Sequence, residues 1–337
     1  MSGRGPGPVL LTGASGFVGA AVMRALVAAG YPVRALVRRP PLFRPAGRVE
    51  TRQGDVTDFA SVLAAARGCR WAIHCAADYR LALGPGDASR MIAVNVGGTA
   101  NLLRACAEAG VRRLVHCSTV GTLDFQRTGR VCTELDVATS SVHLPGPYKR
   151  TKWAAERLVL EAHCPGLEVV VVQPSTPVGG GDQRPTPTGA TIRDFLGGRI
   201  PAVVDTGLNW VDVEAVGRGH LLALERGLAG RSYILGDRNL SLAQMLGRIA
   251  QIAGVEPPRW RVPLALAFAV AGASEAAGRL RREPAGISMT SVRMAAHPMY
   301  VDARRARDEL GWDPGDLELA LRRAVSELGP MAWGWVA

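Results

Sequence analysis

Tyr148 and Lys152 are the two residues of this sequence whose types and spacing best suit acid–base chemistry. Of the 40 cationic side chains only two are lysines, and both lie in the run Tyr148-Lys149-Arg150-Thr151-Lys152. Lysine is a compact ammonium and arginine a planar fork, so the two are not interchangeable. Residues four apart share one face of a helix, and an ammonium beside a phenol lowers a pKa that starts near about 10. The spacing predicts that Tyr148 is a general acid/base assisted by Lys152, although a solvated helix start would show the same pattern.

The length and charge of the chain restrict the classes of function. Its 337 residues suffice for one large or two modest domains. The net charge of +11 would permit binding to nucleic acid or to anionic lipid. The arginines are scattered, however, and aromatic residues make up only 5%, so the chain has no basic block with interleaved aromatics. We therefore expect no nucleic-acid partner and assign the positive charge to a phosphate-bearing cofactor or substrate.

The cysteines and the apolar segments indicate where the protein works. The six cysteines form no Cys-x-x-Cys pair and have no metal-like spacing with histidine, so we expect a reducing cytoplasm and no metal site. Residues 1–8 are rich in glycine and proline and lack the apolar stretch of a signal peptide, which predicts a flexible leader. The most apolar segment, 262–273, is too short to span a bilayer. We expect it to be a packed helix, with peripheral membrane contact left open.

Strand-like and helix-like stretches alternate through the first half of the chain. Buried strands are expected at 8–11, 32–37, 70–77, 113–117 and 167–173, with helices that end at Gly30 and lie at 88–109 and 148–163. This alternation is typical of an α/β protein with a Rossmann-type, doubly wound parallel sheet. After Pro174 the chain turns to short elements, at 232–235, 240–253 and 300–310. We predict an NAD(P)-binding Rossmann domain at 9–174 and a smaller, mainly substrate-binding region at 175–337, from which some segments return to the first domain.

Three glycines, Gly13, Gly16 and Gly19, follow the first strand and open the first helix. Glycine lets a diphosphate approach the backbone closely, and the amides at a helix N-terminus face the phosphates. In this position the G-x-x-G-x-x-G pattern predicts a dinucleotide-binding loop. The cofactor contacts expected from this loop are Gly13, Ser15, Gly16, Phe17, Val18 and Gly19.

The end of the second strand favours one cofactor over another. NAD-binding proteins usually have an acidic residue there for the ribose 2′-hydroxyl, but the first acidic residue of this chain is Glu50. The strand instead ends in Arg38 and Arg39, and an arginine can accept a 2′-phosphate. We predict NADP with Arg38 as its main contact. The alternative is that both arginines are solvated loop residues and NAD binds without its usual acid.

The glycine loop and the Tyr148/Lys152 pair, roughly 130 residues apart, make the chain resemble the extended short-chain dehydrogenase/reductases. That superfamily includes nucleotide-sugar epimerases and dihydroflavonol reductases. Further segments match its pattern: an adenine-contacting turn, a small-residue strand end beside the cofactor, a helix asparagine, and the strand end that carries the catalytic hydroxyl. In this chain they are Gly54-Asp55-Val56, Cys75-Ala76-Ala77, Asn95 and Cys117-Ser118-Thr119. The superfamily often has two serines where this chain has Ser118-Thr119.

A closer resemblance is to the hopanoid-associated sugar epimerase group. Its matching segments are 76–81, 148–150, 173–179, 185–189, 204–209 and 233–236. These resemblances imply an NADP-dependent enzyme in which Tyr148 moves a proton at a substrate oxygen, Thr119 orients that oxygen, and Lys152 holds the nicotinamide ribose and lowers the tyrosine pKa. The implied cofactor contacts beyond the loop are Asp55, Val56, Cys75, Ala76, Ala77, Asn95, Ser118, Tyr148, Lys152, Pro174 and Thr176.

The resemblance leaves several functions open. The enzyme would be an epimerase or reductase of a sugar- or polyol-derived group in hopanoid side-chain biosynthesis. The alternatives are a dihydroflavonol-reductase-like carbonyl reductase of another small molecule and, more remotely, a non-catalytic protein that senses NADP(H). A homodimer is common in the superfamily and is expected here.

The residues that would contact substrate are expected near the cofactor. Asp78, Tyr79 and Arg80 follow a strand end on the cofactor side of the sheet, where an ordinary polar loop is the equal alternative. The family resemblance adds Thr176, Arg184 and Asn209. Two histidines in apolar strands, His74 and His116, are expected to be satisfied core residues. Asp212 and Glu214 are expected to cap a helix.

Overall fold

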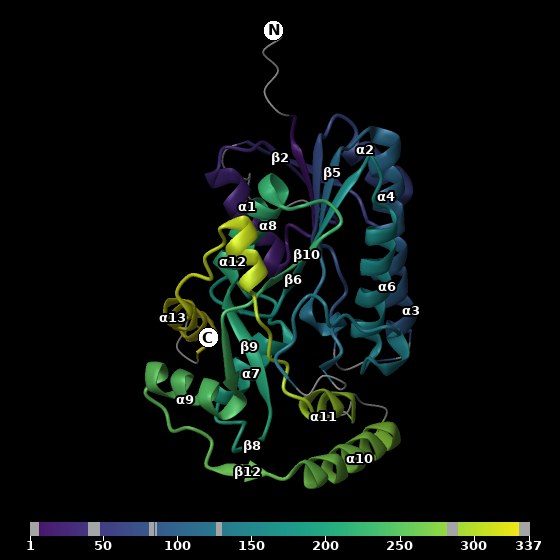
Figure 1. Ribbon diagram of the computed structural model, residues 1–337. Helices are drawn as coiled ribbons and strands as arrows, with labels where there is room; N and C mark the ends of the chain where they lie inside the picture. The colour runs from purple at the N-terminus through teal and green to yellow at the C-terminus, as the bar shows by residue number, and fades with distance from the viewer. Residues whose placement is uncertain are drawn as a thin grey trace.

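The computed structural model describes residues 7–39, 48–80, 84, 86–125, 130–281 and 289–329. The half of the molecule that holds the N-terminus contains a parallel sheet covered by helices, and shorter elements form the other half (Figure 1). The predicted α/β fold with a doubly wound parallel sheet is confirmed. All but the last two residues of the predicted leader at 1–8 lie outside the described residues.

Seven strands, all parallel, form the central sheet in the order β10-β6-β5-β4-β1-β2-β3. Their bounds are β1 Val9–Thr12, β2 Val33–Val37, β3 Val49–Gln53, β4 Trp71–His74, β5 Arg113–Cys117, β6 Glu168–Pro174 and β10 Ser232–Leu235. The inner strands are buried and rich in valine and leucine, as a sheet covered on both faces requires. The strand order reverses between β1 and β4, and ligands of such sheets bind outside the carboxyl ends of the strands at this point.

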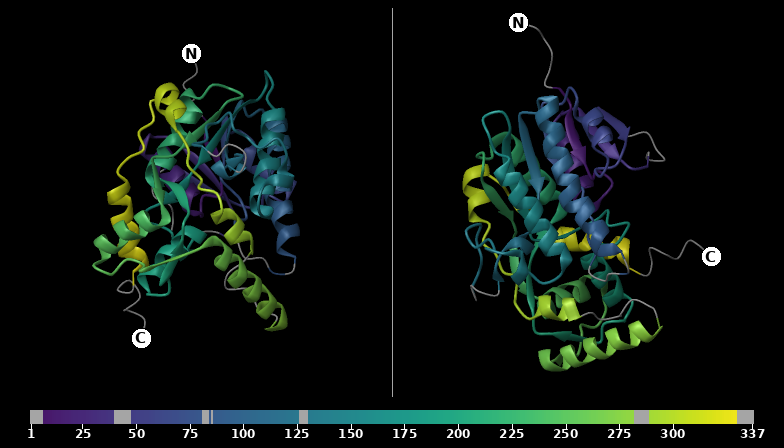
Figure 2. Two further views of the ribbon diagram at one scale, coloured as in Figure 1. Left: turned by 60° about the horizontal axis from the view of Figure 1, so that its bottom comes forward. Right: turned by 90° about the vertical axis from the view of Figure 1, so that its right-hand side faces the viewer.

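Two layers of helices cover the sheet, and successive residues of a strand face different layers. Leu11 packs with α1 (Phe17–Ala28), α8 (Val213–Arg226) and α12 (Arg304–Leu310), whereas Leu10 packs with α2 (Phe59–Ala66), α4 (Gly98–Ala109) and α6 (Pro147–Glu161). Helices α1 and α8 approach closely because Gly217 faces Ala21, whose carbonyl oxygen would lie 2.5 Å from a Cβ at position 217. The views in Figure 2 show the sheet between these two layers.

Three irregular turns shape the carboxyl edge of the sheet. A π-helical turn, η1 (Ala93–Gly97), joins α3 (Asp87–Ile92) to α4. Two short 3₁₀ turns, η2 (Val120–Thr122) and η3 (Ser141–His143), follow β5. Single π-helical turns inside helices often occur at functional sites. The helix predicted at 88–109 is therefore interrupted where Asn95 lies.

The last part of the chain builds a second, smaller core and also returns to the first. The strands β7 (Thr176–Val178), β9 (Gly207–Asp212) and β11 (Arg238–Ser241) form one sheet, and β8 (Ala202–Val204) pairs with β12 (Trp260–Val262). The helices of this part are α7 (Pro187–Leu196), α9 (Leu242–Ala253), α10 (Leu264–Arg281), α11 (Met289–Ala295) and α13 (Leu317–Leu328). Strand β10 lies beside β6 in the main sheet and α8 covers that sheet, so segments beyond residue 175 do return to it.

Two smaller sequence predictions are settled by this fold. Asp212 is the N-cap of α8 and accepts a hydrogen bond from the Glu214 amide at 3.0 Å, so the predicted cap is confirmed. Of the apolar segment 262–273, Val262 ends β12 and residues 264–273 lie in the helix α10, in which Leu266 and Val270 are exposed. Among the described residues, no helix has the length and apolar character needed to cross a membrane.

Candidate active site

The glycine loop packs directly against the end of β4, across the point where the strand order reverses. Gly13 has a φ of 74°, and a Cβ there would lie 2.5 Å from the Ala76 nitrogen. A Cβ at Gly19 would lie 2.1 Å from the Gly13 carbonyl oxygen, so α1 can approach the loop only with glycine at this position. Gly16 begins α1 without a side-chain cap. The amides of the first turn are left for an anion, which fits the diphosphate of a dinucleotide.

Most of the predicted cofactor contacts follow the carboxyl end of a strand. Gly13 follows β1, Asp55 follows β3, Cys75 follows β4, and Ser118 follows β5. Pro174 ends β6, and Arg38 follows β2 with an exposed side chain. Because the strands are parallel, these residues lie along one edge of the sheet, where the sequence analysis places the cofactor.

The acidic residue nearest to Arg38 in sequence is not at this edge. Glu50 lies opposite Arg34 across β2 and β3, and the two side chains form an ion pair at 2.8 Å. No ion pair involves Arg38 within the described part of the chain. The Arg38 guanidinium is exposed just after β2, and its charge helps to lower the pKa of Asp55 just after β3.

Both lysines lie on α6 and are buried, with exposed fractions of 8% for Lys149 and 2% for Lys152. The Lys152 ammonium donates to the Cys117 carbonyl oxygen at 2.7 Å and lies 3.4 Å from Nε2 of His116. Burial lowers the pKa of Lys152, against the opposing effect of the carboxylate of Glu156 and of the Cys117 thiol. His116 is buried as predicted, but it is not the satisfied core histidine expected. Its Nδ1 has no hydrogen-bond partner among the described residues, and its Nε2 faces the lysine of the predicted catalytic pair.

The ring of Tyr148 stacks on Tyr79, with centroids 4.2 Å apart and planes tilted by 34°. Burial raises the pKa of Tyr148 well above its usual range, and neighbouring Tyr79 and Cys117 raise it further. This corrects the predicted lowering by Lys152, whose ammonium is directed at the end of β5 instead. Tyr148 carries its proton in this arrangement and can donate it to a substrate oxygen.

The two hydroxyls after β5 have different partners. Thr119 Oγ1 accepts a hydrogen bond from the Gly121 amide at 3.0 Å, and its own proton stays free to orient. The Ser118 hydroxyl donates to the buried carboxylate of Glu156, which Thr122 and Gln173 also approach. Burial raises the pKa of Glu156, and these hydrogen bonds oppose the rise. The Ser118 hydroxyl is therefore committed to a buried partner, whereas the Thr119 hydroxyl can still donate a hydrogen bond to another group.

Asn95 fastens the end of β4 to α6. Its Oδ1 accepts from the Asp78 amide at 2.7 Å, while its Nδ2 donates to the Asp78 carbonyl at 3.0 Å and to Thr151 Oγ1 at 3.0 Å. The predicted cofactor contact thus acts on the protein's own backbone. It positions the 76–79 segment beside the helix that carries Tyr148.

Of the predicted substrate contacts, the structure brings only Tyr79 against Tyr148. Asp78 and Arg80 form an ion pair at 2.9 Å, so their charges are paired within the protein. Asn209 is 1% exposed, donates to Asn239 and accepts from the Asp237 amide, which commits its amide to the fold. Thr176 begins β7 and Arg184 is exposed ahead of α7, and within the described part of the chain neither side chain forms a hydrogen bond or ion pair with the residues around Tyr148.

A hollow of about 310 Å³ lies beside the start of α6, between η3 and the helices α10 and α11. Its lining includes His143, Arg150, Phe268, Arg293 and His297. An adjoining smaller hollow shares several of these residues and reaches Lys149, next to Tyr148. Burial lowers the pKa of Lys149 to about 8.

Sequence reasoning did not find Glu156, Arg293 or His297. Glu156 had a local signal, because it stands four residues after Lys152 and shares its helix face. Arg293 and His297 had none, since only the fold brings α11 to the start of α6.

The chain is similar to known enzymes over most of its length. A family profile described as the NAD dependent epimerase/dehydratase family matches residues 9–236. A protein of Synechocystis sp. that carries the provisional name dihydroflavonol 4-reductase is 38% identical over 94% of this chain and 92% of its own length. Sterol demethylase protein B of Methylococcus capsulatus is 33% identical over 94% of this chain and 97% of its own.

Solved structures give the same picture. The protein in the crystal structure of gox2253 has 38% sequence identity to this chain and superposes with a TM-score of 0.82. The match covers 95% of this chain and 97% of that chain. A nucleoside-diphosphate-sugar epimerase from Pseudomonas aeruginosa is 27% identical with a TM-score of 0.74, with 95% of this chain and 96% of that chain covered. The glycine loop, the seven strands of the main sheet and the residues that follow β5 all lie within residues 9–236, which the family profile matches.

Proposed function

Because this chain belongs to the NAD dependent epimerase/dehydratase family, we propose that it catalyses NADP-dependent hydride transfer at a carbinol or carbonyl carbon. Membership of this family indicates the general activity, that of an NAD(P)-dependent epimerase or reductase. The main support for hydride transfer at a carbinol or carbonyl carbon is that the glycine loop, Thr119 and Tyr148 lie at one edge of the sheet. We propose a sugar- or polyol-derived substrate of hopanoid side-chain biosynthesis, by resemblance to that epimerase group.

Each residue of the proposed site has one task. Tyr148, protonated when buried, donates its proton to the carbonyl oxygen in the reducing direction and takes it back in the oxidising one. The Thr119 hydroxyl orients the same oxygen. Lys152, whose ammonium donates to the Cys117 carbonyl oxygen, would hold the nicotinamide ribose. The bound cofactor supplies the hydride, and the protein supplies orientation and electrostatics.

The cofactor proposed is NADP. Glycine at positions 13 and 19 lets the loop pack against the end of β4 and the start of α1, because a Cβ at either would clash with backbone atoms. This close packing leaves the amides of the first turn of α1 for a dinucleotide diphosphate. The exposed guanidinium of Arg38, with Glu50 paired elsewhere, supports the 2′-phosphate over the 2′-hydroxyl.

A lipid-derived substrate is supported by one surface of the molecule. Trp260, Leu266 and Val270 are 69%, 53% and 44% exposed, and α10 lies at the end of the molecule farthest from the N-terminus (Figure 1). Arg259 and Arg261, also exposed, flank the tryptophan. Phe268 of the same helix lines the 310 Å³ hollow. We place this face against an anionic membrane, from which a lipid substrate would reach the hollow.

Vesicle sedimentation tests this membrane contact. The protein should bind vesicles that contain phosphatidylglycerol, bind neutral phosphatidylcholine vesicles less, and lose binding in Trp260→Ser/Leu266→Ser. The matched control is Leu228→Ser, which changes an exposed leucine on another element. Equal sedimentation of the double variant would remove the membrane contact from the proposal.

Two observations favour net reduction as the second candidate. The exposed Arg38 would favour NADP(H), the cofactor pool that drives reductions, and the Synechocystis relative is named for a reductase. The third candidate, a non-catalytic NADP(H) sensor, has no use for Thr119 and Tyr148. We also propose a cytoplasmic homodimer, to be tested by sedimentation velocity.

One experiment separates these candidates. The desalted protein is analysed by mass spectrometry for retained nucleotide and then assayed with 4-deuterated NADPH and a panel of sugar- and polyol-derived ketones. An epimerase retains its nucleotide and inverts a stereocentre without net consumption of NADPH. A reductase binds added NADPH and transfers deuterium to the product. Binding of neither NADPH nor NADH would contradict the proposed function.

A further inference from the structure

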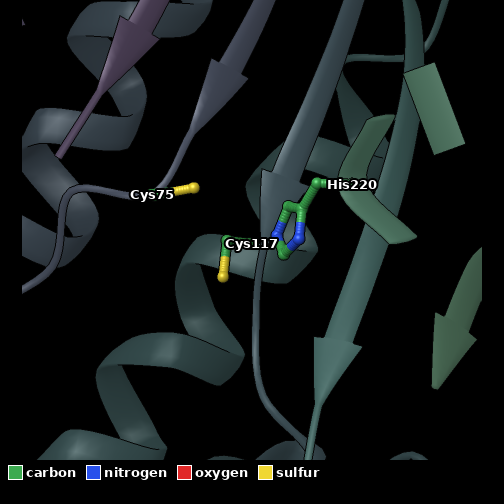
Figure 3. Close-up of side chains that lie close together, drawn as sticks. All are labelled: Cys75, Cys117 and His220. Carbon is green, nitrogen blue, oxygen red and sulfur yellow. The ribbon is translucent and has the colours of Figure 1, made fainter. Parts of the chain in front are cut away.

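Three side chains that are far apart in sequence meet beside the proposed nicotinamide position. Cys75 follows β4, Cys117 ends β5, and His220 lies in α8. Their two sulfur atoms and an imidazole nitrogen all lie within 4.8 Å of one another (Figure 3). No local sequence pattern indicates this group, because Cys117 stands 42 residues after Cys75 and His220 roughly another hundred residues later.

The parallel sheet explains why the two thiols meet. In the parallel pair of β4 and β5, His74 lies opposite His116. The next residue of each chain segment is a cysteine, Cys75 just after β4 and Cys117 at the end of β5, and their sulfur atoms lie within 4.8 Å of each other. Neighbouring strands lie about 4.8 Å apart, within the range of about 4.4–6.8 Å between Cα atoms that a disulfide needs. Helix α8 covers this face and brings in His220.

His220 presents an unpaired ring nitrogen inside this group. Its ring is fully buried, and Nδ1 lies 2.8 Å from the Val216 carbonyl oxygen. A carbonyl only accepts, so Nδ1 donates this hydrogen bond, and Nε2 is the ring nitrogen left for another group. This buried Nε2 has no hydrogen-bond partner among the described residues.

The two thiols differ in reactivity. A hydrogen bond with Cys75, with help from His220 and the Lys152 ammonium, holds the pKa of Cys117 well below its usual range although burial opposes this. The same hydrogen bond and burial raise the pKa of Cys75. A thiolate beside a protonated thiol is the arrangement of a reactive cysteine with its resolving partner.

A metal ion fits this group less well than thiol chemistry. The described residues offer only three donor atoms here, one short of the tetrahedral set of a structural zinc site. The Lys152 ammonium, 2.7 Å from the Cys117 carbonyl oxygen, also opposes a dication at this place. Partial exposure of both cysteines admits a small oxidant instead.

We propose that Cys75 and Cys117 form a modification site for hydroperoxides, with His220 as the proton acceptor. The Cys117 sulfur attacks the peroxide, an S–O bond forms as the O–O bond breaks, and the hydroxide released takes the proton that His220 holds. The Cys75 thiol then attacks the sulfenic acid, and a disulfide and water form. Two thiols and one hydrogen peroxide thus give one disulfide and two waters, with the peroxide as the two-electron acceptor.

The site is coupled to the cofactor cradle. The Cys75 backbone packs against the glycine loop, since a Cβ at Gly13 would lie 2.5 Å from the Cys75 carbonyl carbon. The Cys117 carbonyl oxygen accepts a hydrogen bond from Lys152. Bound NADP(H) should therefore shield the thiols, an expectation that rests on the proposed function.

The test is a peptide map of the full chain after limiting hydrogen peroxide, with the remaining thiols alkylated. We expect a Cys75–Cys117 linked peptide to form at least tenfold faster than oxidation of exposed Cys164, which serves as the internal control. Cys75→Ser should trap a dimedone-reactive sulfenic acid at Cys117, and His220→Gln should slow linkage severalfold. Near-ultraviolet circular dichroism verifies that each variant is folded.

Three outcomes would overturn the proposal: no linked peptide in the wild-type protein, Cys164 oxidised first, or a stoichiometric zinc ion that blocks the thiols and is removed by chelator. A saturating dose of NADPH adds a separate readout. Linkage that forms but is not slowed by NADPH would confirm the modification site and contradict the proposed place of the cofactor.

Discussion

The Lys152 ammonium donates to the carbonyl oxygen of Cys117 at 2.7 Å, and this hydrogen bond ties α6 to the end of β5. Tyr148, four residues earlier on the same helix, stacks on Tyr79. The lysine therefore organises the strand end that Ser118 and Thr119 follow. Its direct effect on the tyrosine is secondary to burial, which raises the pKa of Tyr148.

Tyr148→Phe should abolish turnover and spare the fold. The phenol proton is the one that reaches the substrate oxygen, and loss of a general acid lowers kcat by about 10²–10⁴-fold. NADPH affinity, measured by isothermal titration calorimetry, should stay within a few fold. Tyr31→Phe is the matched control, since the Tyr31 hydroxyl bonds Glu225 away from the site. Full activity in Tyr148→Phe would remove the tyrosine from the mechanism.

Gly19→Ala should damage the cofactor site far more than Gly16→Ala. A Cβ at Gly19 would lie 2.1 Å from the Gly13 carbonyl oxygen, whereas at Gly16 the nearest atom would be 3.3 Å away. We expect NADPH binding to weaken at least a hundredfold, about 2.7 kcal/mol, for Gly19→Ala and less than tenfold for Gly16→Ala. Calorimetric titration measures this, and thermal unfolding separates a lost site from a lost fold. Equal effects of the two substitutions would contradict the packing argument.

The parts of the fold that the sequence predicted are those with local signals. The strands at 113–117 and 232–235 have the predicted bounds, because each has a short apolar centre, Leu114-Val115 and Tyr233-Ile234-Leu235. β3 was missed: its sequence Val49–Gln53 is mostly polar, and it forms only because β2 offers an open edge. Its Glu50 pairs with Arg34, a contact between strands that no local pattern reveals.

The site was predictable in position and less so in chemistry. Strand ends and glycine spacing place the cofactor edge, because every strand runs in the same direction. The sign of the Tyr148 pKa shift was wrong, since spacing on a helix says nothing of burial or of where an ammonium points. Asn209 illustrates the same limit: its amide faces Asn239 and Asp237, partners brought by the fold.

Lys149→Met should stabilise the protein near neutral pH and flatten its pH dependence. Burial lowers the pKa of Lys149 from its usual value of 10.5 to about 8. Between these values the unfolded chain binds the proton and the folded one does not, so stability rises with pH in this window. Below pH 8 both states are protonated and the burial cost is fully present. The change across the window is about 3 kcal/mol, at 1.36 kcal/mol for each pKa unit.

Urea unfolding at pH 7, 8, 9 and 10 measures this slope. The wild type should gain stability relative to Lys149→Met as pH rises, because other groups titrate alike in both proteins. Arg150→Met is the control: it removes an exposed charge from the next position, and arginine keeps its proton throughout. A parallel pair of curves for wild type and Lys149→Met would show that the ammonium is not buried.

Arg38→Ala should change the choice of cofactor, and Arg39→Ala should not. Both arginines follow β2 and are exposed, so they share charge and solvation and differ only in their place on the chain. A charge-assisted contact to the 2′-phosphate contributes about 1.5–3 kcal/mol, which predicts that Arg38→Ala binds NADPH about 10- to 100-fold more weakly. NADH, which has no phosphate there, should bind both variants as it binds the wild type. Competition titration of the two nucleotides measures the ratio directly. If Arg39→Ala weakened NADPH binding and Arg38→Ala did not, Arg39 would be the residue that contacts the 2′-phosphate. If neither did, the cofactor would be NAD, bound without the acidic partner that usually holds its ribose.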